Sequence, residues 1–337
     1  MPTVSYKTYF SDEMDKWWFY YEQLPEKGLG AYHRPDYFLF QEKVDFGRAV
    51  LQVFQTSDRF IYYPGLLRPL PEPEKGFDID SGWYYGGPVS SRPCLSPLEP
   101  AWTKVINSAR RELDVTAEFI RFDPNLQNYS LFDGFMPVEY NRETVVVDLQ
   151  PGWPVVWKNF SSQNRRNVRK ATESRLIVEK RDDHACWKSF RDIYMEEMIR
   201  KNAPKHLRFS AEFFGALQEL ACMDLFVISC QDQIIGGFIA ATGKHIAHHF
   251  LSATRHEFWD IRPNNLLFTE VIKYYHQNGF LFFDFQGGRE GVFRFKCNFS
   301  DNRRKFYVGK KIFDHDKYDR LSQSIKTNFF PAYRENT

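Results

Sequence analysis

The chain has 337 residues, of which 43% are hydrophobic and 26% charged, and this excludes a disordered or fibrous protein and favours two folded domains. The formal net charge is +2, but residues 1–150 hold 15 Lys+Arg against 22 Asp+Glu, and residues 151–337 hold 30 against 21. The two halves therefore carry −7 and +9, which predicts an anionic partner for the second half. Part of this charge could equally hold the halves together.

No targeting or membrane-spanning segment is expected. The first 18 residues carry acidic side chains and lack the apolar stretch of a signal peptide, and no run of about 18 apolar residues follows. The cysteines are odd in number, scattered and without metal-ligand spacing, which predicts reduced thiols in a cytoplasmic protein and no metal site. They are Cys94, Cys186, Cys222, Cys230 and Cys297.

Turn formers and alternating apolar residues divide the first half into strands and one helix. The segment up to about Leu29 is expected to be irregular or helical, and the Gly- and Tyr-rich residues 81–93 a loop. Residues 100–113 predict a helix with an apolar stripe and Pro100 in its first turn. Strands are expected at 48–54, 59–67, 115–122 and 143–149.

The segment PGWP at 151–154 predicts a boundary between domains 1–150 and 151–337. Helices are expected at 160–172, 183–202, 210–222 and 262–278, and strands at 175–181, 224–230, 234–242, 245–253, 280–285 and 303–312. A strand, two helices, antiparallel strands, a helix and a strand make a mixed α/β domain. This is the order of the GNAT fold, whose sheet splays open at its centre, and the first half shows a rougher version of it.

Four segments resemble the Fem-type aminoacyltransferases, which have duplicated GNAT domains. They are SGWYYGGP (81–88), NFSSQNRRNVRKA (159–171), RPNNLLFTEVIKYYHQNGF (262–280) and DFQGGREGVFRFKCNF (284–299). The resemblance implies two GNAT-like domains with splayed mixed sheets flanked by helices, the first on the acceptor side and the second on the donor side. It also implies acyl transfer, in this family usually of an aminoacyl group from aminoacyl-tRNA to an amine of a cell-wall precursor.

The chain departs from the family and from CoA-using GNAT enzymes at two loops. The first-half loop reads Gly82-Trp83-Tyr84-Tyr85 where the family often has Pro-Tyr-Gly-Tyr. The helix after the central strands begins Arg262-Pro263-Asn264-Asn265-Leu266, without the glycines that let backbone N–H groups surround a pyrophosphate. A bulky anionic donor is therefore favoured over acetyl-CoA, although a helix N-terminus can still hold one phosphate.

Basic residues of the second half are the candidates for donor binding. On the helix expected at 160–172 the cations fall within an arc of roughly 140°. They form either an anion-binding face or a solvated face with acidic partners elsewhere in the chain. The donor-binding candidates are Arg165, Arg166, Arg169, Lys170, Asn264, Asn265 and Arg294.

The candidate catalytic residues lie in the segment 284–296. The resemblance singles out Phe295 and Lys296, and Lys296 could stabilise the oxyanion of the transition state. Arg294 is expected to share one face of an extended segment with Lys296. Asp284, which ends an apolar strand, is either a base or, as we favour, a structural cap for a sharp turn at the following glycines. Glu290 is a weaker candidate base.

Acceptor-binding candidates come from both halves. Tyr84 and Tyr85 either contact the acceptor or anchor the loop, and Phe295 adjoins Lys296. His249 could line the acceptor site together with His245, whereas His248 points to the other face of its strand. Ordinary sheet positions are the alternative for these histidines.

The sequence thus predicts an acyltransferase that transfers an aminoacyl or other acyl group to an amine of a sugar, peptidoglycan, polysaccharide or secondary-metabolite precursor. The alternatives are an N-acyltransferase dependent on acyl-CoA or an acyl carrier, and a non-catalytic ligand-binding module. No bound cofactor is expected. The expected partners are a small-molecule or glycan-precursor acceptor and an acyl donor that acts as co-substrate, with aminoacyl-tRNA favoured and acyl-CoA second. The sequence leaves the oligomeric state open.

Overall fold

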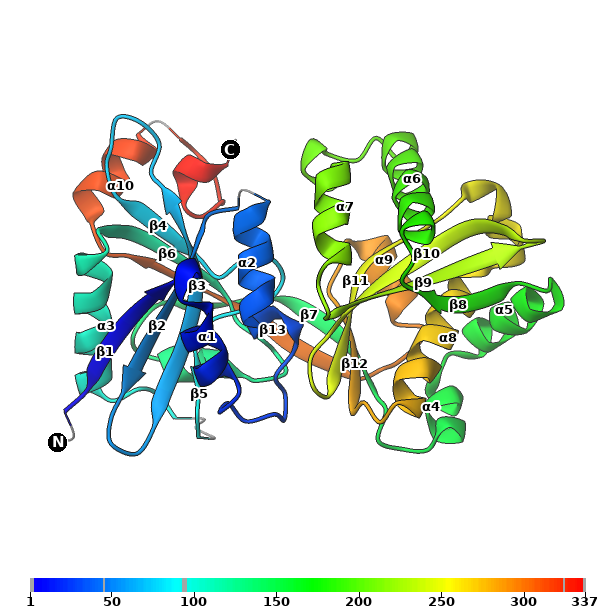
Figure 1. The fold of residues 1–337 in the computed structure, drawn as a ribbon, viewed down its shortest axis with the longest axis horizontal. Coiled ribbons are helices and arrows are strands. Elements are labelled where there is room, and N and C mark those ends of the chain that lie inside the picture. Colours follow the sequence, from blue (N-terminus) through cyan, green and yellow to red (C-terminus); the bar gives the residue numbers. More distant parts are fainter. Residues whose placement is uncertain (1–2, 45, 93–95, 324, 336–337) are drawn as a thin grey trace. The chain divides into compact units, whose positions relative to one another are not determined.

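The computed structural model describes residues 3–44, 46–92, 96–323 and 325–335, so the predicted thiol Cys94 lies outside it. The chain divides into two compact units (Figure 1), unit 1 with Met1–Arg142 and Lys305–Thr337 and unit 2 with Glu143–Arg304. This division differs from the predicted one mainly because residues 305–337 belong to unit 1. The cause is that the last strand pairs antiparallel with a strand of unit 1, from Val308↔Arg121 to Ile312↔Ala117.

Unit 1 contains a sheet in the order β1-β2-β3-β4-β6-β13, with β5 paired to β3. Neighbouring strands are antiparallel except β4 and β6, which are parallel. The strands are β1 (Ser5–Phe10), β2 (Arg48–Gln55), β3 (Phe60–Pro69), β4 (Phe77–Asp80), β5 (Val89–Ser90), β6 (Val115–Arg121) and β13 (Arg303–Ile312). The helices are α1 (Met14–Tyr21), α2 (Pro35–Lys43), α3 (Pro100–Glu112) and α10 (His315–Ser322).

The core of unit 1 includes one face of α3. The predicted stripe of α3 is buried at Trp102, Ile106 and Ala109. Arg110 on the same helix is also buried, where its guanidinium pairs with Glu118 on β6 at 2.7 Å. A buried charge needs such a partner, because burying it unpaired would cost much of the free energy of folding.

Two predictions for the first half were incomplete. The opening segment was expected to be irregular or helical, but its first part is the strand β1, which pairs with β2 along its whole length. Its sequence SYKTYF is short and mixes polar with aromatic residues without regular alternation, so it gives only a weak strand signal. The helix α2 and the short strand β4 were also missed.

Unit 2 contains a sheet in the order β8-β9-β10-β11-β12-β7, in which only β11 and β12 are parallel neighbours. Each unit therefore has four antiparallel strands, then a parallel neighbour, then an antiparallel strand, as expected for two GNAT-like domains. The strands are β7 (Val138–Asp148), β8 (Ile177–Arg181), β9 (Met223–Cys230), β10 (Gln233–Thr242), β11 (Ile246–Thr254) and β12 (Phe282–Gln286). The residues Gln231 and Asp232 are both left-handed, and they close a hairpin between β9 and β10.

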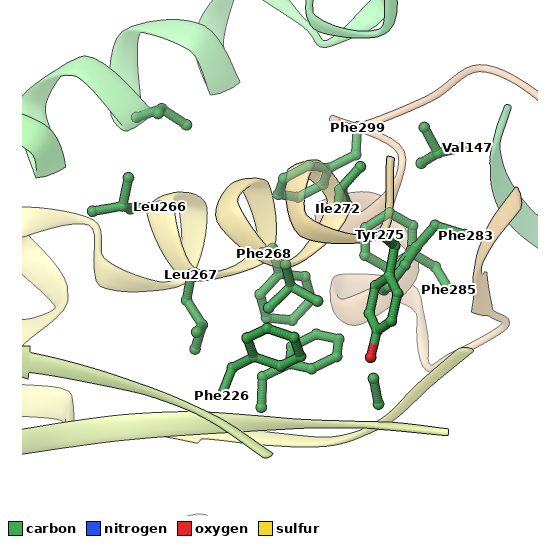
Figure 2. Close-up of a cluster of buried hydrophobic side chains, with 14 of the residues drawn as sticks. Val147, Phe226, Leu266, Leu267, Phe268, Ile272, Tyr275, Phe283, Phe285 and Phe299 are labelled. Carbon is green, nitrogen blue, oxygen red and sulfur yellow. The ribbon is translucent and has the colours of Figure 1, made fainter. Parts of the chain in front are cut away.

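The helices of unit 2 are α4 (Trp153–Asn159), α5 (Ser162–Glu173), α6 (His184–Arg200), α7 (Ala211–Gln218), α8 (Pro263–Gln277) and α9 (Glu290–Lys296). The central one is α8, which packs its apolar face on the sheet (Figure 2). Phe268 and Ile272 lie there among Phe226, Phe283 and Phe285. The helix ends at Gln277, and Gly279 follows it with a φ of 78°, the left-handed conformation of a glycine in the C′ position.

Two helices of unit 2 were not predicted. The helix α4 begins within the PGWP segment, with Pro154 in its first turn. The helix α9 covers the segment that was expected to be extended. None of the helices in the described ranges is long and apolar enough to cross a membrane.

Candidate functional site

The candidate site of unit 2 begins where two parallel strands stop pairing. β11 and β12 pair over three residues each, ending at His248 and Asp284, although β11 continues to Thr254. Irregularities follow directly on both strands: the register of β11 against β10 skips Phe250, and that of β12 against β7 shifts after Asp284. Such bulges bend a strand and re-aim its side chains, and they are common beside active sites.

A left-handed residue ends β12. Gln286 has a φ of 61°, which is unfavourable for a side chain other than glycine. Its N–H donates to Oδ1 of the buried Asp284 at 2.6 Å, and this bond stabilises the turn. The prediction that Gly287 and Gly288 supply the turn geometry was therefore wrong. The bond to Asp284 is the kind of contact expected of a structural cap, while its role as a base stays a prediction.

Lys296, the last residue of α9, is 4% exposed. Its Nζ donates to the main-chain oxygens of Phe285 and Gly287, both at 2.6 Å. Burial lowers the pKa of this ammonium to about 8, although the nearby Asp284 carboxylate opposes the shift. An ammonium has three N–H donors, and the described residues supply acceptors for two of them. The third has no acceptor among the described residues.

His249 lies on β11 beside this lysine. Its Nε2 is 2.9 Å from Oγ of Ser252, and its ring packs against Phe238 and Phe268 at centroid distances of 4.9 and 5.5 Å. Burial, together with the positive charge of Lys296, holds the pKa of this imidazole well below its usual value. His249 is therefore neutral at neutral pH and does not compete with Lys296 for a negative charge.

The first turns of α5 and α8 meet at a pair of amides. Nδ2 of Asn265 donates to Oδ1 of Asn164 at 2.7 Å, and both residues are buried. Nδ2 of Asn164 has no hydrogen-bond partner among the described residues. An unsatisfied buried donor costs about 1–3 kcal/mol, so an acceptor atom of a ligand would stabilise this corner.

The segment that leads into α5, and α5 itself up to Thr172, carries only positive charges. Residues 149–172 contain five Lys+Arg and no Asp or Glu. Arg165 is half-buried, and its guanidinium donates to the main-chain oxygens of Lys158 and Phe160. Arg166, Arg169 and Lys170 are exposed on α5, and no ion pair to them is seen in the described ranges.

Residues 158–296, all in unit 2, match the family model of the acetyltransferase (GNAT) domain. This stretch of unit 2 is therefore a GNAT domain. Comparison with curated proteins finds no match. The GNAT domain includes the two divergent strands, α8 and Lys296.

Solved structures show the same fold over most of the chain. The crystal structure of FemX is similar with a TM-score of 0.70 and 13% identity, covering 94% of this chain and 99% of that chain. L-PGS from Bacillus licheniformis has a TM-score of 0.51 and 13% identity, covering 77% and 84%. A tandem GNAT protein from the clavulanic acid biosynthesis pathway has a TM-score of 0.50 and 10% identity, covering 91% and 98%. The Fem-like fold predicted from the sequence is thus confirmed.

Two predicted site residues lie apart from this constellation. Glu290 and Arg294 are 85% and 78% exposed and form an ion pair at 2.7 Å. The expectation that Arg294 and Lys296 share a face was wrong, because the segment is helical and two residues along a helix are about 200° apart. The spacing of Glu290 and Arg294 is that of a helical ion pair. Phe295, half-buried, packs its ring against Phe268 at 5.2 Å.

The remaining predicted site residues are Asn264, Tyr84 and Tyr85. Asn264 is half-buried in the first turn of α8. Tyr84 and Tyr85 belong to unit 1, where Tyr84 is half-buried and left-handed, with a φ of 66°. Tyr85 is 3% exposed and packs on Tyr32 and Phe306, the position of a loop anchor. A contact of either tyrosine with the acceptor stays a prediction.

Sequence reasoning missed three polar residues that link α5 to α8 and to the end of α9: Ser161, Asn164 and Asn298. Ser161 is the N-cap of α5 and accepts from the N–H of Asn164 at 3.0 Å. A serine before a helical stretch is a recognisable N-cap signal. No local signal links it to Asn298, because the contact joins positions 137 residues apart.

Proposed function

We propose that the chain transfers an aminoacyl group from an aminoacyl-tRNA to an amine acceptor. The observation that carries the proposal is the buried ammonium of Lys296 at the point where β11 and β12 diverge. The proposal is also supported by the fold that the chain shares with FemX and by the segment 149–172, which is basic and contains no Asp or Glu. The acceptor proposed from the sequence is an amine of a sugar, peptidoglycan or polysaccharide precursor.

The chemistry asked of the protein is modest. When the amine attacks the acyl carbonyl, negative charge develops on the carbonyl oxygen. A donor fixed beforehand in a water-poor site stabilises this charge far more than water does. Lys296 is fixed by its two carbonyl partners and can give its remaining N–H to that oxygen. When the tetrahedral intermediate collapses, the ester C–O bond to the tRNA ribose breaks and the ribose oxygen leaves as a hydroxyl with the amine's proton, which passes through a carboxylate or directly within the substrate. The neutral His249 can accept a hydrogen bond from the attacking amine.

The donor end would lie at the first turns of α5 and α8. Anions bind at helix N-termini, where backbone N–H groups and the helix dipole favour negative charge. The unpartnered Nδ2 of Asn164 adds a donor there, and the exposed cations Arg166, Arg169 and Lys170 add positive charge further along α5. A polyanionic donor with several phosphates suits this arrangement.

The second candidate donor is acetyl-CoA, because the matched family model is that of an acetyltransferase domain. The absence of glycine from Arg262 to Leu266 counts against it. The deciding experiment offers the protein tRNA charged with labelled amino acids and, separately, labelled acetyl-CoA, together with a panel of amino sugars and muropeptides. We expect transfer from charged tRNA that RNase abolishes. Transfer from acetyl-CoA alone would replace the aminoacyl proposal, and no transfer from either would refute it.

Neutralising the exposed α5 cations should weaken donor use without harming the fold. In the variant Arg166→Gln/Arg169→Gln/Lys170→Gln we expect KM for charged tRNA to rise about 10- to 100-fold at low salt. The slope of log affinity against log salt should flatten by about 2, since each lost phosphate contact contributes about 0.7–0.9. The control neutralises three exposed lysines of unit 1, Lys7, Lys27 and Lys75. An equal effect of both variants would mean that only net charge matters.

A further inference from the structure

A chain of hydrogen bonds runs from the first turn of α8 to the last turn of α9. It begins at the amide pair Asn265–Asn164, 2.7 Å apart. It continues through the bond from the N–H of Asn164 to Oγ of Ser161, at 3.0 Å. Oγ of Ser161 then donates to Oδ1 of Asn298 at 2.8 Å. The two ends of this chain carry the proposed donor-binding turn and the residue proposed for catalysis.

Ser161 is the centre of this chain. Its hydroxyl uses a lone pair for the N–H of α5 and its proton for Asn298, and its own N–H donates to the main-chain oxygen of Asn298 at 2.8 Å. A helix cap needs only the first of these contacts. The other two join α5 to the residue that follows Lys296 by two positions.

Asn298 holds the C-terminal end of α9. Its Nδ2 donates to the main-chain oxygens of Arg294 and Phe295, at 3.2 and 3.1 Å. These carbonyls belong to the residues just before Lys296, and helix C-termini leave such carbonyls without intrahelical partners. With Oδ1 on Ser161 and Nδ2 on α9, the Asn298 amide fixes where the end of α9 lies.

We propose that Ser161 and Asn298 are positioning residues that keep Lys296 in its buried position, hydrogen-bonded to the main-chain oxygens of Phe285 and Gly287. α9 has only seven residues, and a helix of that length is not stable by itself. The two bonds of Lys296 Nζ are 2.6 Å long, so a displacement of about 1 Å would break them. Displacements of that size can cost about 10²-fold in rate. The catalytic consequence rests on the proposed function, but the positioning does not.

The surroundings of Lys296 provide the readout. Two titratable side chains interact electrostatically with its ammonium, Asp284 on β12 and His249 on β11. The ring of Phe268 on α8 packs against those of His249 and Phe295. The other charged groups of α9, Glu290 and Arg294, are exposed and paired to each other. The pKa of Lys296 is low because its ammonium is buried. If the ammonium moves out of this buried position, it must therefore titrate at higher pH.

The test is a titration of the ¹³Cε signal of Lys296 by NMR in the full chain, assigned through its loss in Lys296→Arg. In the wild type we expect a midpoint near pH 8. In Ser161→Ala and in Asn298→Ala the midpoint should rise by about 1 or more towards the value of about 10.4 for a free lysine. Because both substitutions break the same Ser161–Asn298 hydrogen bond, the midpoint in the double variant should rise no further than in the single variants.

The matched control is Ser174→Ala at the other end of α5, where the hydroxyl bonds only to the main-chain oxygen of Lys170. Its midpoint should equal that of the wild type. Unchanged midpoints in Ser161→Ala and Asn298→Ala, in protein that remains folded by circular dichroism, would overturn the proposal. If either variant fails to fold, the neutral Asn298→Gln, which displaces the amide by one methylene without adding a charge, decides the matter by the same midpoint.

Failure of the proposed function would look different. If no donor supports transfer, the NMR midpoints still report whether Ser161 and Asn298 hold Lys296. If transfer occurs, the high-pH limb of kcat/KM should move upward together with the NMR midpoint, while KM for the donor changes less than kcat. A purely structural role would lower the melting temperature and leave both midpoints in place.

Discussion

Replacing Lys296 by Met should lower kcat of acyl transfer about 10²- to 10³-fold, the usual cost of removing one donor to a developing oxyanion. Met has nearly the length of the lysine stem but cannot donate to the substrate. The effect should fall on kcat more than on KM, because the interaction is made in the transition state. Steady-state kinetics with the donor identified above would measure both. A loss below about fivefold would remove Lys296 from the mechanism.

The same substitution should not unfold the protein. The wild type keeps a charge in a buried site, so its removal offsets the loss of the two bonds to carbonyl oxygens. The folded protein releases the Lys296 proton near pH 8 and the unfolded chain near 10.5. Between these values the unfolded state holds more protons, so raising the pH stabilises wild type relative to Lys296→Met, by about 3 kcal/mol in total. Below pH 8 the difference should not depend on pH.

Activity should show the matching pH dependence. The wild-type rate should fall above about pH 8, where the ammonium of Lys296 loses its proton. The matched control is Lys311→Met in unit 1, where burial also lowers the pKa of a lysine that donates to a main-chain oxygen, that of Phe135 at 2.9 Å. Its kcat should be unchanged. Equal losses in both variants would point to a general structural effect.

The fold could be predicted where local pattern and tertiary structure agree. The predicted strand 303–312 coincides with β13. The predicted helix 100–113 matches α3 within one residue, because apolar residues that recur over several helical turns are the strongest local signal. The parallel neighbours β11 and β12 also follow from the predicted order of elements. What no local pattern revealed is that residues 305–337 complete the sheet of unit 1, since strand pairing over such distances leaves no mark in nearby residues.

The site was predicted in its residue types more than in its geometry. Lys296 was singled out by resemblance, and the structure shows the burial that shifts its pKa. The alternation of FRFK suggested an extended segment, whereas the Glu290–Arg294 spacing was the helical signal that should have prevailed. Gln286 gave no signal at all, because a left-handed conformation of a glutamine depends on the Asp284 bond that stabilises it. The link between Ser161 and Asn298 is tertiary and needed coordinates.

Replacing Phe268 by Ala should destabilise unit 2 by about 3–5 kcal/mol, the range for a buried phenylalanine. Phe268 is 4% exposed on α8, and Figure 2 shows it among the aromatic side chains between this helix and the sheet. Its ring lies 4.9 Å from that of Phe238 and 5.8 Å from those of Phe285 and Phe299. Truncation would leave a cavity that these rigid rings cannot fill by small adjustments.

Urea unfolding followed by circular dichroism would measure the loss, with a separate transition of unit 2 analysed by itself if the two units unfold apart. Phe268→Leu keeps most of the volume and should cost less than half as much. Phe19→Ala, at a side chain 59% exposed on α1, should change stability by less than about 0.5 kcal/mol. Phe268 also packs against His249 and Phe295. Its loss should therefore loosen the packing of these two neighbours of Lys296 and lower kcat even where the protein remains folded. A cost below about 1 kcal/mol would show that the core of the GNAT domain can repack, and that its aromatic side chains do not fix the site.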